Sequence, residues 1–487
     1  MLTPAPLSTI IALARAGALD HAWGQFVAGG YDREDQDDPA ALTVKGRLLK
    51  DHALRAPDEA ERRRYYLQSA ECYRRAAALQ PGTYPLINAA TLSLLSGNRD
   101  QAEEIAGEVL ERIAREPEEP ETPYWRAATE AEALLLLGRT GEARVALEAA
   151  IAAAPRAWED HGSTLRQFLA IQDQLGGETA DLDLLRPPRS LYYAAAKADG
   201  ADPGETLAAP LDADIGFGFG ALAAGLEIEI AEALLAQDAE LHVILPGDAE
   251  SFTARFVDPH GEAWRRRFDA ALAAAESVRH VRPLNRAPDA ASVALADRVA
   301  WGAALLNARR LMGDAVASTP GRDVEADGLA LLAIRVGPGA EAGFEERLGE
   351  LRDALAEAGT PALAPYLNGE TILAGYGDCA AAASVARTVH ARLRGRIALQ
   401  IAGHYGLIDR VRDPFSGATR PTGSGADIAE AIVAATPPGS VCVSDDFAAV
   451  LAAGGASGEA GWIGELSALD GGSAIGLYAL NPGSTAS

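Results

Sequence analysis

A glycine-rich turn in the middle of the chain has the residue types that bring a backbone close to a ligand. Gly216, Gly218 and Gly220 alternate with phenylalanines, and Gly225 precedes a helical pattern that contains Glu232. Glycines let the main chain approach a ligand, and the N-terminus of a helix attracts anions. The spacing therefore predicts a site for a nucleotide or another phosphorylated ligand. The alternative interpretation is a purely structural turn.

Other patterns exclude several kinds of chemistry. None of the three lysines lies in a GxxxxGK[ST] loop, which excludes a P-loop nucleotidase. The three cysteines are far apart, which excludes a disulfide framework and a cysteine-rich zinc site. No HExxH or GxSxG motif occurs. His242 alternates with apolar neighbours on a predicted strand, and we interpret it as a structural histidine rather than a general base.

The composition describes a strongly acidic protein. Its 487 residues include 43 Lys and Arg against 69 Asp and Glu, a formal charge of −26. Such a surface repels phosphate backbones and anionic lipid headgroups, so we expect neither a nucleic-acid partner nor a membrane partner. The N-terminus has no basic leader segment, and no apolar run approaches the ~20 residues of a spanning helix, so we expect a cytoplasmic protein. The run Arg265-Arg266-Arg267 is predicted to be a solvated helix face.

The first part of the chain has a helical sequence pattern. Residues 1–183 have helical periodicity throughout and are predicted to form an all-α repeat domain. A glycine is followed five residues later by an alanine in three places: Gly17/Ala22, Gly97/Ala102 and Gly138/Ala143. Glycine ends one helix in the left-handed conformation, and the small alanine lets the next helix approach closely. The pattern predicts stacked helix pairs with a surface that binds a protein partner.

Two sheet-containing domains are predicted to follow. The segment 186–190 breaks the helical pattern and marks a boundary. Residues 187–318 alternate strand, turn and helix, which predicts an α/β domain with a parallel, Rossmann-like sheet. Residues 325–481 predict an α+β domain with one mostly antiparallel sheet, in which Asn368-Gly369 is expected to form a type I′ hairpin turn.

Strings in the first two domains resemble known families. YPLINAATLSLLSG and AWEDHGSTLRQF resemble tetratricopeptide repeats, in particular the TRAF-binding region of apoptosis signal-regulating kinases and bacterial signalling proteins. The string GFGALAAGLEIEIAEALLAQDAELHVILP resembles the SLOG and deoxyribohydrolase-like nucleotide-processing domains. In that family an acid follows the glycine turn. Here Leu226 takes its position and Glu227 stands one residue later, while Glu232 is retained.

Residues 325–481 resemble class III adenylate and guanylate cyclases, through the strings QIAGHYG and TPPGSVCVSDDFAAVL. The resemblance implies two metal-binding carboxylates, an Asn that orients the ribose and an Arg that stabilises the transition state. On this sequence the four positions become Ile334, Glu370, Asp427 and Ala431.

These four residues imply that cyclase catalysis is lost. An isoleucine cannot bind Mg²⁺, an acid at position 427 repels a polyphosphate, and an alanine cannot stabilise a phosphorane. Glu370 is the remaining candidate metal ligand. We therefore expect a degenerate domain without enzyme activity.

Three functions compete at this point. The first is a bacterial signalling or regulatory scaffold, expected to be a homodimer, whose repeats bind a protein partner and whose inactive cyclase-like domain serves dimerisation or nucleotide sensing. The second is an active cyclase that converts ATP or GTP to a cyclic nucleotide, using Mg²⁺ or Mn²⁺ held by Glu370 and a borrowed acid. The third is an enzyme that binds or hydrolyses a nucleotide through the Rossmann-like domain. The sequence assigns no cofactor beyond the metal that the second function would need.

Overall fold

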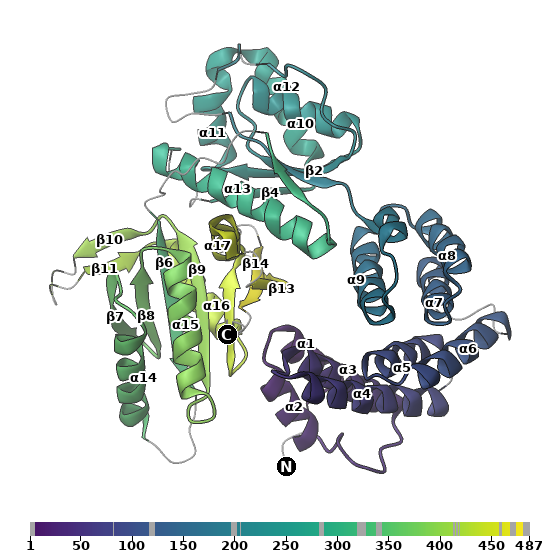
Figure 1. Ribbon diagram of the computed structural model, residues 1–487. Coiled ribbons are helices and arrows are strands. Elements are labelled where there is room, and N and C mark those ends of the chain that lie inside the picture. The colour runs from purple at the N-terminus through teal and green to yellow at the C-terminus, as the bar shows by residue number, and fades with distance from the viewer. Residues whose placement is uncertain are drawn as a thin grey trace. The chain divides into compact units, whose positions relative to one another are not determined.

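The computed structural model divides the chain into two compact units, Met1–Pro187 and Pro188–Ser487 (Figure 1). The division falls inside the segment 186–190 that breaks the helical pattern. The structure describes residues 5–80, 82–115, 122–195, 202–204, 206–281, 287–318, 328–337, 343–412, 414, 417, 419–456, 460–467 and 474–480. The expected domain limits at residues 325 and 481 lie outside these described residues.

The described part of the first unit is helical. Its elements are α1 (Leu7–Arg15), α2 (Leu19–Ala28), α3 (Pro39–Arg55), α4 (Glu59–Leu79), α5 (Thr83–Leu95), α6 (Arg99–Arg115), α7 (Pro123–Leu136), α8 (Thr140–Ala153), α9 (Trp158–Leu175) and the 3-10 helix η1 (Ala180–Leu185). Helices α3 and α4, α5 and α6, and α7 and α8 pack as pairs. The predicted helical repeats are therefore confirmed.

Three turns between consecutive helices follow the predicted glycine and alanine spacing. The glycines between α1 and α2, α5 and α6, and α7 and α8 have φ values of 81°, 93° and 72°. Only glycine adopts this left-handed conformation without strain. The alanine five residues after each glycine is buried, which lets the second helix of the pair pack closely.

The second unit begins with a parallel sheet. Its strands are β1 (Arg189–Tyr192), β2 (Ile215–Gly220), β3 (Glu240–Leu245), β4 (Ser277–His280) and β5 (Ala315–Ala317), in the order β4-β3-β2-β1-β5. All four pairings are parallel. The connecting helices are α10 (Leu226–Ala236), α11 (Ala249–Phe256), η2 (Asp258–His260), α12 (Glu262–Ala274) and α13 (Ala290–Leu311). Apolar runs such as Leu241–Leu245 suit strands that helices cover on both faces.

The same unit contains a second, mostly antiparallel sheet. Its strands are β6 (Leu329–Val336), β7 (Leu363–Asn368), β8 (Thr371–Tyr376), β9 (Leu399–Gly406), β12 (Ser440–Ser444), β13 (Ala460–Leu466) and β14 (Ile475–Leu480), in the order β13-β14-β12-β9-β6-β8-β7. Among the described strands of this second sheet, only β9 and β12 pair in parallel, and the other pairings are antiparallel. Its helices are α14 (Phe344–Ala358), α15 (Cys379–Leu393), α16 (Ser424–Ala435), α17 (Asp445–Leu451) and η3 (Ala452–Ala456).

Two parts of this sheet region differ from the prediction. The mixed charges of residues 409–412 are typical of a solvated loop, but β10 (Asp409–Arg412) pairs with β11 (Thr419–Thr422) in a two-stranded ribbon. The hairpin turn is also displaced by one residue. Asn368 pairs with Thr371, so Gly369 and Glu370 form the loop. Gly369 has a φ of 59° and Glu370 does not have a positive φ, which fits a type II′ turn rather than the type I′ turn that we predicted.

Helix α13 joins the two sheets into one unit. It packs against β1, β2 and β3 of the parallel sheet and also against α17. At Gly302 the two helices approach so closely that a Cβ would collide with the backbone of Ala449. The second and third expected domains therefore share one compact unit, because α13 is apolar on both of these faces.

Candidate functional site

The glycines of the predicted ligand turn are needed for packing within the protein. A Cβ at Gly218 would collide with the side chain of Leu234, and one at Gly220 would collide with Tyr193. A Cβ at Gly216 would collide with the side chain of Pro188. Strand β2 therefore lies tightly against α10 and against the segment after β1. This arrangement supports the structural interpretation of these three glycines, and a ligand role for them stays a prediction.

The N-terminus of α10 is occupied by a carboxylate of the chain itself. Gly225 precedes α10 with a φ of 100°, and residues 202–203 pack against it. Glu227, in the first turn, is only 1% exposed. Its Oε1 accepts the backbone N–H of Ala195 at 2.8 Å, and its Oε2 accepts that of Ala223 at 2.7 Å. Glu227 thus places a carboxylate in the first turn of α10, where the helix dipole favours negative charge, and it accepts two backbone N–H groups that lie outside the helix.

Glu232 lies one turn further along α10 and pairs with an arginine. Its two carboxylate oxygens accept hydrogen bonds from Nε and Nη2 of Arg267 at 2.8 and 2.7 Å. The guanidinium of Arg267 also lies 4.1 Å from the ring centre of Trp264. Both charged side chains are partly exposed, at 43% and 33%. These contacts join α10 to α12, and the predicted cofactor-binding role of Glu232 is not supported by them.

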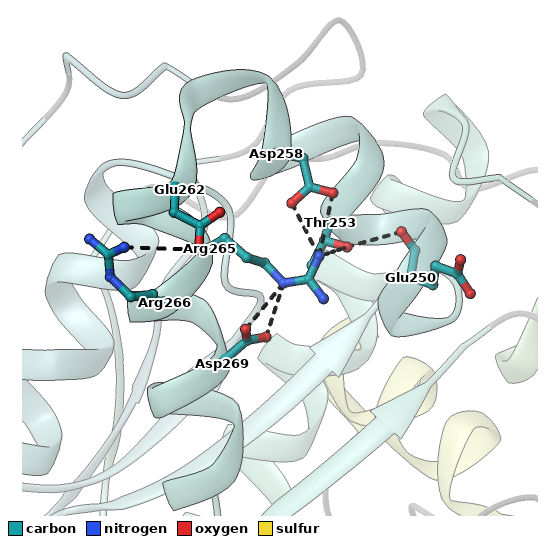
Figure 2. A network of polar contacts seen from close by, with 7 residues as sticks. All are labelled: Glu250, Thr253, Asp258, Glu262, Arg265, Arg266 and Asp269. Carbon is teal, nitrogen blue, oxygen red and sulfur yellow. Dashed lines mark hydrogen bonds and ion pairs between the residues drawn. The ribbon is translucent and has the colours of Figure 1, made fainter.

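The other arginines of the same run also pair with acids. Figure 2 shows Arg265 between Asp258 and Asp269, at 3.2 and 3.1 Å. Arg266 lies 3.9 Å from Glu262. All three arginines remain at least a third exposed. The run therefore lies on a partly exposed helix face whose arginines are all paired with acids.

His242 is held inside the parallel sheet. Its ring stacks on Phe219 with the centres 4.6 Å apart, and its Nδ1 lies 2.8 Å from Ser277 Oγ. Burial lowers the pKa of His242 to about 4. The histidine is neutral at neutral pH and serves packing, as the sequence predicted.

Ile334 stands near the hairpin end of β6, in a row of aliphatic side chains that runs across the sheet. It is fully buried and pairs with Ile372 on β8 and Ile401 on β9. Neighbouring residues on a strand face opposite sides of the sheet, and directly paired residues share a side. The three isoleucines therefore form one continuous row. No atom of this row can bind a cation.

The four positions taken from the cyclase resemblance do not converge. Ala333, next to Ile334, packs in the core that contains residues of α16, so Ile334 faces the other side of the sheet. Asp427 and Ala431 lie on α16, where Asp427 is exposed. Glu370 is exposed in the hairpin loop. The structure therefore separates Ile334 from the side chains of α16.

The residues at this end of β6 do not fit a Mg²⁺ or Mn²⁺ ion. Ile334 has no donor atom, and Glu370 offers one exposed carboxylate. Arg335, which our sequence reasoning did not consider, follows on the strand, and its Nε donates to Thr371 Oγ1 at 3.0 Å. Because neighbouring residues of a strand face opposite sides, Arg335 lies on the other side of the sheet from Ile334, and a guanidinium offers no donor to a cation there. In the described part of the chain, no group of three or more His, Cys, Asp or Glu residues could hold a metal ion.

A mostly buried ionic cluster links the two sheets, and no sequence pattern predicted it. Arg279 of β4 donates through Nη2 to Asp446 and lies 2.8 Å from Asp445 Oδ1, both at the start of α17. Asp445 also accepts the backbone N–H of Gly476 at 3.2 Å. Burial raises the pKa of Asp445 to about 6, and Arg279 opposes this shift. Arg279 and Asp446 are 167 residues apart, so no local spacing could reveal the pair.

His404 lies next to this cluster. Its Nδ1 is 3.0 Å from the hydroxyl of Ser444, which also caps α17 by accepting the N–H of Phe447. Burial lowers the pKa of His404 to about 4. The neutral ring is packed below the start of α16, near Gly425. Its role is to connect β9 with the N-terminus of α17.

Comparisons with known proteins give one family match and one set of related folds. A family described as TPR-S, Tetratricopeptide Repeats-Sensor, matches residues 8–93. No curated protein sequence matches the chain. No helix among the described residues has the length and apolar character needed to span a membrane.

Solved adenylate and guanylate cyclase structures are similar to about a third of this chain. A Trypanosoma brucei adenylate cyclase is 10% identical, with 33% of this chain and 92% of that chain covered and a TM-score of 0.27. For the Silicibacter pomeroyi adenylate/guanylate cyclase/hydrolase the identity is 20%, the coverage 32% and 98%, and the TM-score 0.26. The adenylyl cyclase CyaB from P. aeruginosa is 11% identical, with 32% of this chain and 95% of that chain covered and a TM-score of 0.26.

Proposed function

We propose that this protein is a signalling or regulatory scaffold. Its helical repeats bind a protein partner, its Rossmann-like module is structural, and its cyclase-like domain serves dimerisation or nucleotide sensing without turnover. The cytoplasmic location and the bacterial origin expected from the sequence belong to the same proposal.

The row of isoleucines that crosses β8, β6 and β9 carries this proposal. A cyclase needs carboxylates that hold two metal ions against the triphosphate. In the cyclase-like alignment the first carboxylate position is Ile334, between Ile372 and Ile401. The next residue, Arg335, faces the other side of the sheet and has no metal donor either. This end of the strand thus lacks the metal donors that a cyclase needs.

Two further observations support a module without chemistry. The buried carboxylate of Glu227 already supplies a negative charge in the first turn of α10 and accepts two nearby backbone N–H groups. Arg279 and Asp445, whose side chains are mostly buried, are bonded to each other across the two sheets. Their arrangement is that of a structural joint rather than an open site.

A product assay tests the proposal directly. The full chain is incubated with ATP or GTP and Mn²⁺, and cyclic AMP and cyclic GMP are measured. We expect no product above that of a protein-free control. Product that disappears in Glu370→Ala, while Glu346→Ala retains it, would show an active cyclase and overturn the proposal. Glu346 is a matched control because it is an exposed acid of α14.

Binding measurements separate the remaining parts of the proposal. Light scattering of the purified chain is expected to give the mass of a homodimer, and a monomer at all concentrations would contradict the dimerisation role. A thermal-shift screen of nucleotides tests sensing. The chain is also assayed for nucleotide hydrolysis. Hydrolysis that is lost in a variant of the Rossmann-like domain would favour the alternative that this domain is an enzyme.

A further inference from the structure

Helix α9 bonds to more than one of the preceding helix pairs. Lys50 of α3 donates through Nζ to Gln167 Oε1 at 3.4 Å, and Gln167 Nε2 donates to Glu132 Oε1 of α7 at 2.9 Å. Helix α9 also contacts α5. In stacked repeats each pair contacts only its neighbours. A helix that reaches α3, α5 and α7 therefore lies across the face that the first helices of these pairs share.

A buried polar network fixes α9 on this face. Glu132 is 8% exposed and accepts hydrogen bonds from Gln167 and from the hydroxyl of Thr91 on α5. Burial raises the pKa of Glu132 and lowers the pKa of Lys50. A buried carboxylate needs donors, because leaving it unpaired is strongly unfavourable. The face therefore favours a helix that presents a carboxamide at the position of Gln167.

Aromatic and apolar contacts complete the match. The hydroxyls of Tyr124 and Thr164 are 2.8 Å apart, and the ring of His161 stacks on Tyr124 at 5.3 Å between centres. Leu165 and Phe168 are buried from the same helix. A cavity of about 230 Å³ remains where the end of α9 meets α4. Helix α9 thus occupies the face without filling it completely.

We propose that α9 is an internal occupant of the partner-binding face of the repeats. The same face binds a partner helix that is amphipathic and carries a carboxamide beside an aromatic side chain, and this partner takes the place of α9. The inference rests on the proposed protein-binding function of the repeats. It adds the chemistry of the partner and makes α9 an autoinhibitory competitor.

The probe is a labelled synthetic peptide with the sequence of residues 158–175, added to the full-length chain. Fluorescence anisotropy compares wild type with Phe168→Ala, which weakens the anchoring of α9. Ser163→Ala is the matched control because Ser163 is exposed on the same helix. We expect the peptide to bind Phe168→Ala at least about tenfold more tightly than it binds wild type or Ser163→Ala. A peptide with Gln167→Leu is expected to bind about tenfold more weakly than the wild-type peptide, because Glu132 loses a donor.

The possible failures are distinguishable. If wild type and Phe168→Ala bind the peptide equally, the face binds helices but α9 is not a competitor, and this inference is overturned alone. If neither binds, although hydrogen exchange shows α9 released in the variant, the protein-binding function fails as well. Should Phe168→Ala not fold, the double variant Thr164→Ala and Gln167→Ala replaces it, since it removes hydrogen bonds without opening a large apolar cavity.

Discussion

The N-terminus of α10 and the hairpin end of β6 are two places where the sequence predicted a ligand, and they differ in what stands there. At α10 two backbone N–H donors are present, and the buried carboxylate of Glu227 accepts both. At β6 the position that the cyclase resemblance assigns to a metal ligand is Ile334, which stands in an aliphatic row. Under the proposed function the first site is filled, whereas the second has been replaced.

The difference has a physical consequence. A filled anion site can be reopened by removing one side chain, because the backbone N–H groups and the helix end remain. A replaced metal site cannot be restored by one substitution, because a carboxylate placed in an apolar row lacks the cations and hydrogen bonds that would stabilise it. Variants at the two places should therefore behave differently.

The largest effect is expected for Ile334→Asp. An isolated carboxylate in this row is expected to destabilise the fold by about 5 kcal/mol or more near neutral pH, since burial shifts such a pKa by up to about 5 units. Urea unfolding measures the loss, and Ile334→Val, at about 1 kcal/mol, is the control. A stable Ile334→Asp protein that makes a cyclic nucleotide with Mn²⁺ would break the comparison.

The second-largest effect is expected for the ionic cluster between the two sheets. Arg279→Met leaves Asp445 and Asp446 without their cation and is expected to destabilise the unit by about 3–5 kcal/mol. The matched control Arg266→Met removes an exposed arginine and is expected to cost less than about 1 kcal/mol. Thermal or urea unfolding checks both. Equal effects of the two substitutions would show that the cluster does not join the sheets.

The pH dependence of the same cluster has a defined sign. The pKa of Asp445 is raised from 3.8 to about 6 on folding. Proton binding by this group therefore favours the folded state fully below the unfolded value, and this contribution is lost as the pH rises through about 6. Without Arg279 the carboxylates are harder to ionise, so the stability difference between wild type and Arg279→Met should be larger near pH ~8 than near pH ~5. A difference that is constant over this range would contradict the assignment.

A smaller loss is expected for Glu227→Ala, with a gain that separates the two regions. The substitution leaves the N–H groups of Ala195 and Ala223 without this acceptor and is expected to destabilise by about 2–4 kcal/mol. Because the anion site is then open, sulfate should raise the melting temperature of Glu227→Ala more than that of wild type. Equal stabilisation of the two proteins by sulfate would mean that Glu227 does not fill an anion site.

The smallest effect is expected for Glu232→Ala. The ion pair with Arg267 is partly exposed, so its loss should change the free energy of unfolding by at most about 1 kcal/mol. Urea unfolding measures this change. A nucleotide that stabilises wild type but not Glu232→Ala would restore the ligand role predicted from the sequence.

Much of the local structure was predictable. The helix pairs with their glycine turns, and the order of a parallel sheet followed by a mostly antiparallel one, agree with the sequence patterns, because apolar periodicity and turn residues act over a few positions. The hairpin turn was misplaced by one residue, because the Asn-Gly pair alone does not decide which residues pair across the strands. The ribbon β10–β11 was missed, since its charged and polar residues read as a loop.

The sequence by itself determined the helix pairs and the absence of a donor atom at position 334. A left-handed turn requires glycine wherever it lies, and an isoleucine lacks a donor atom in any fold. Only the tertiary structure decided that Glu227 fills the end of α10, that Arg279 holds the two sheets together, and that α9 crosses the face of the repeats. Each of these depends on groups brought together from distant parts of the chain, whose burial and pairing no local pattern encodes.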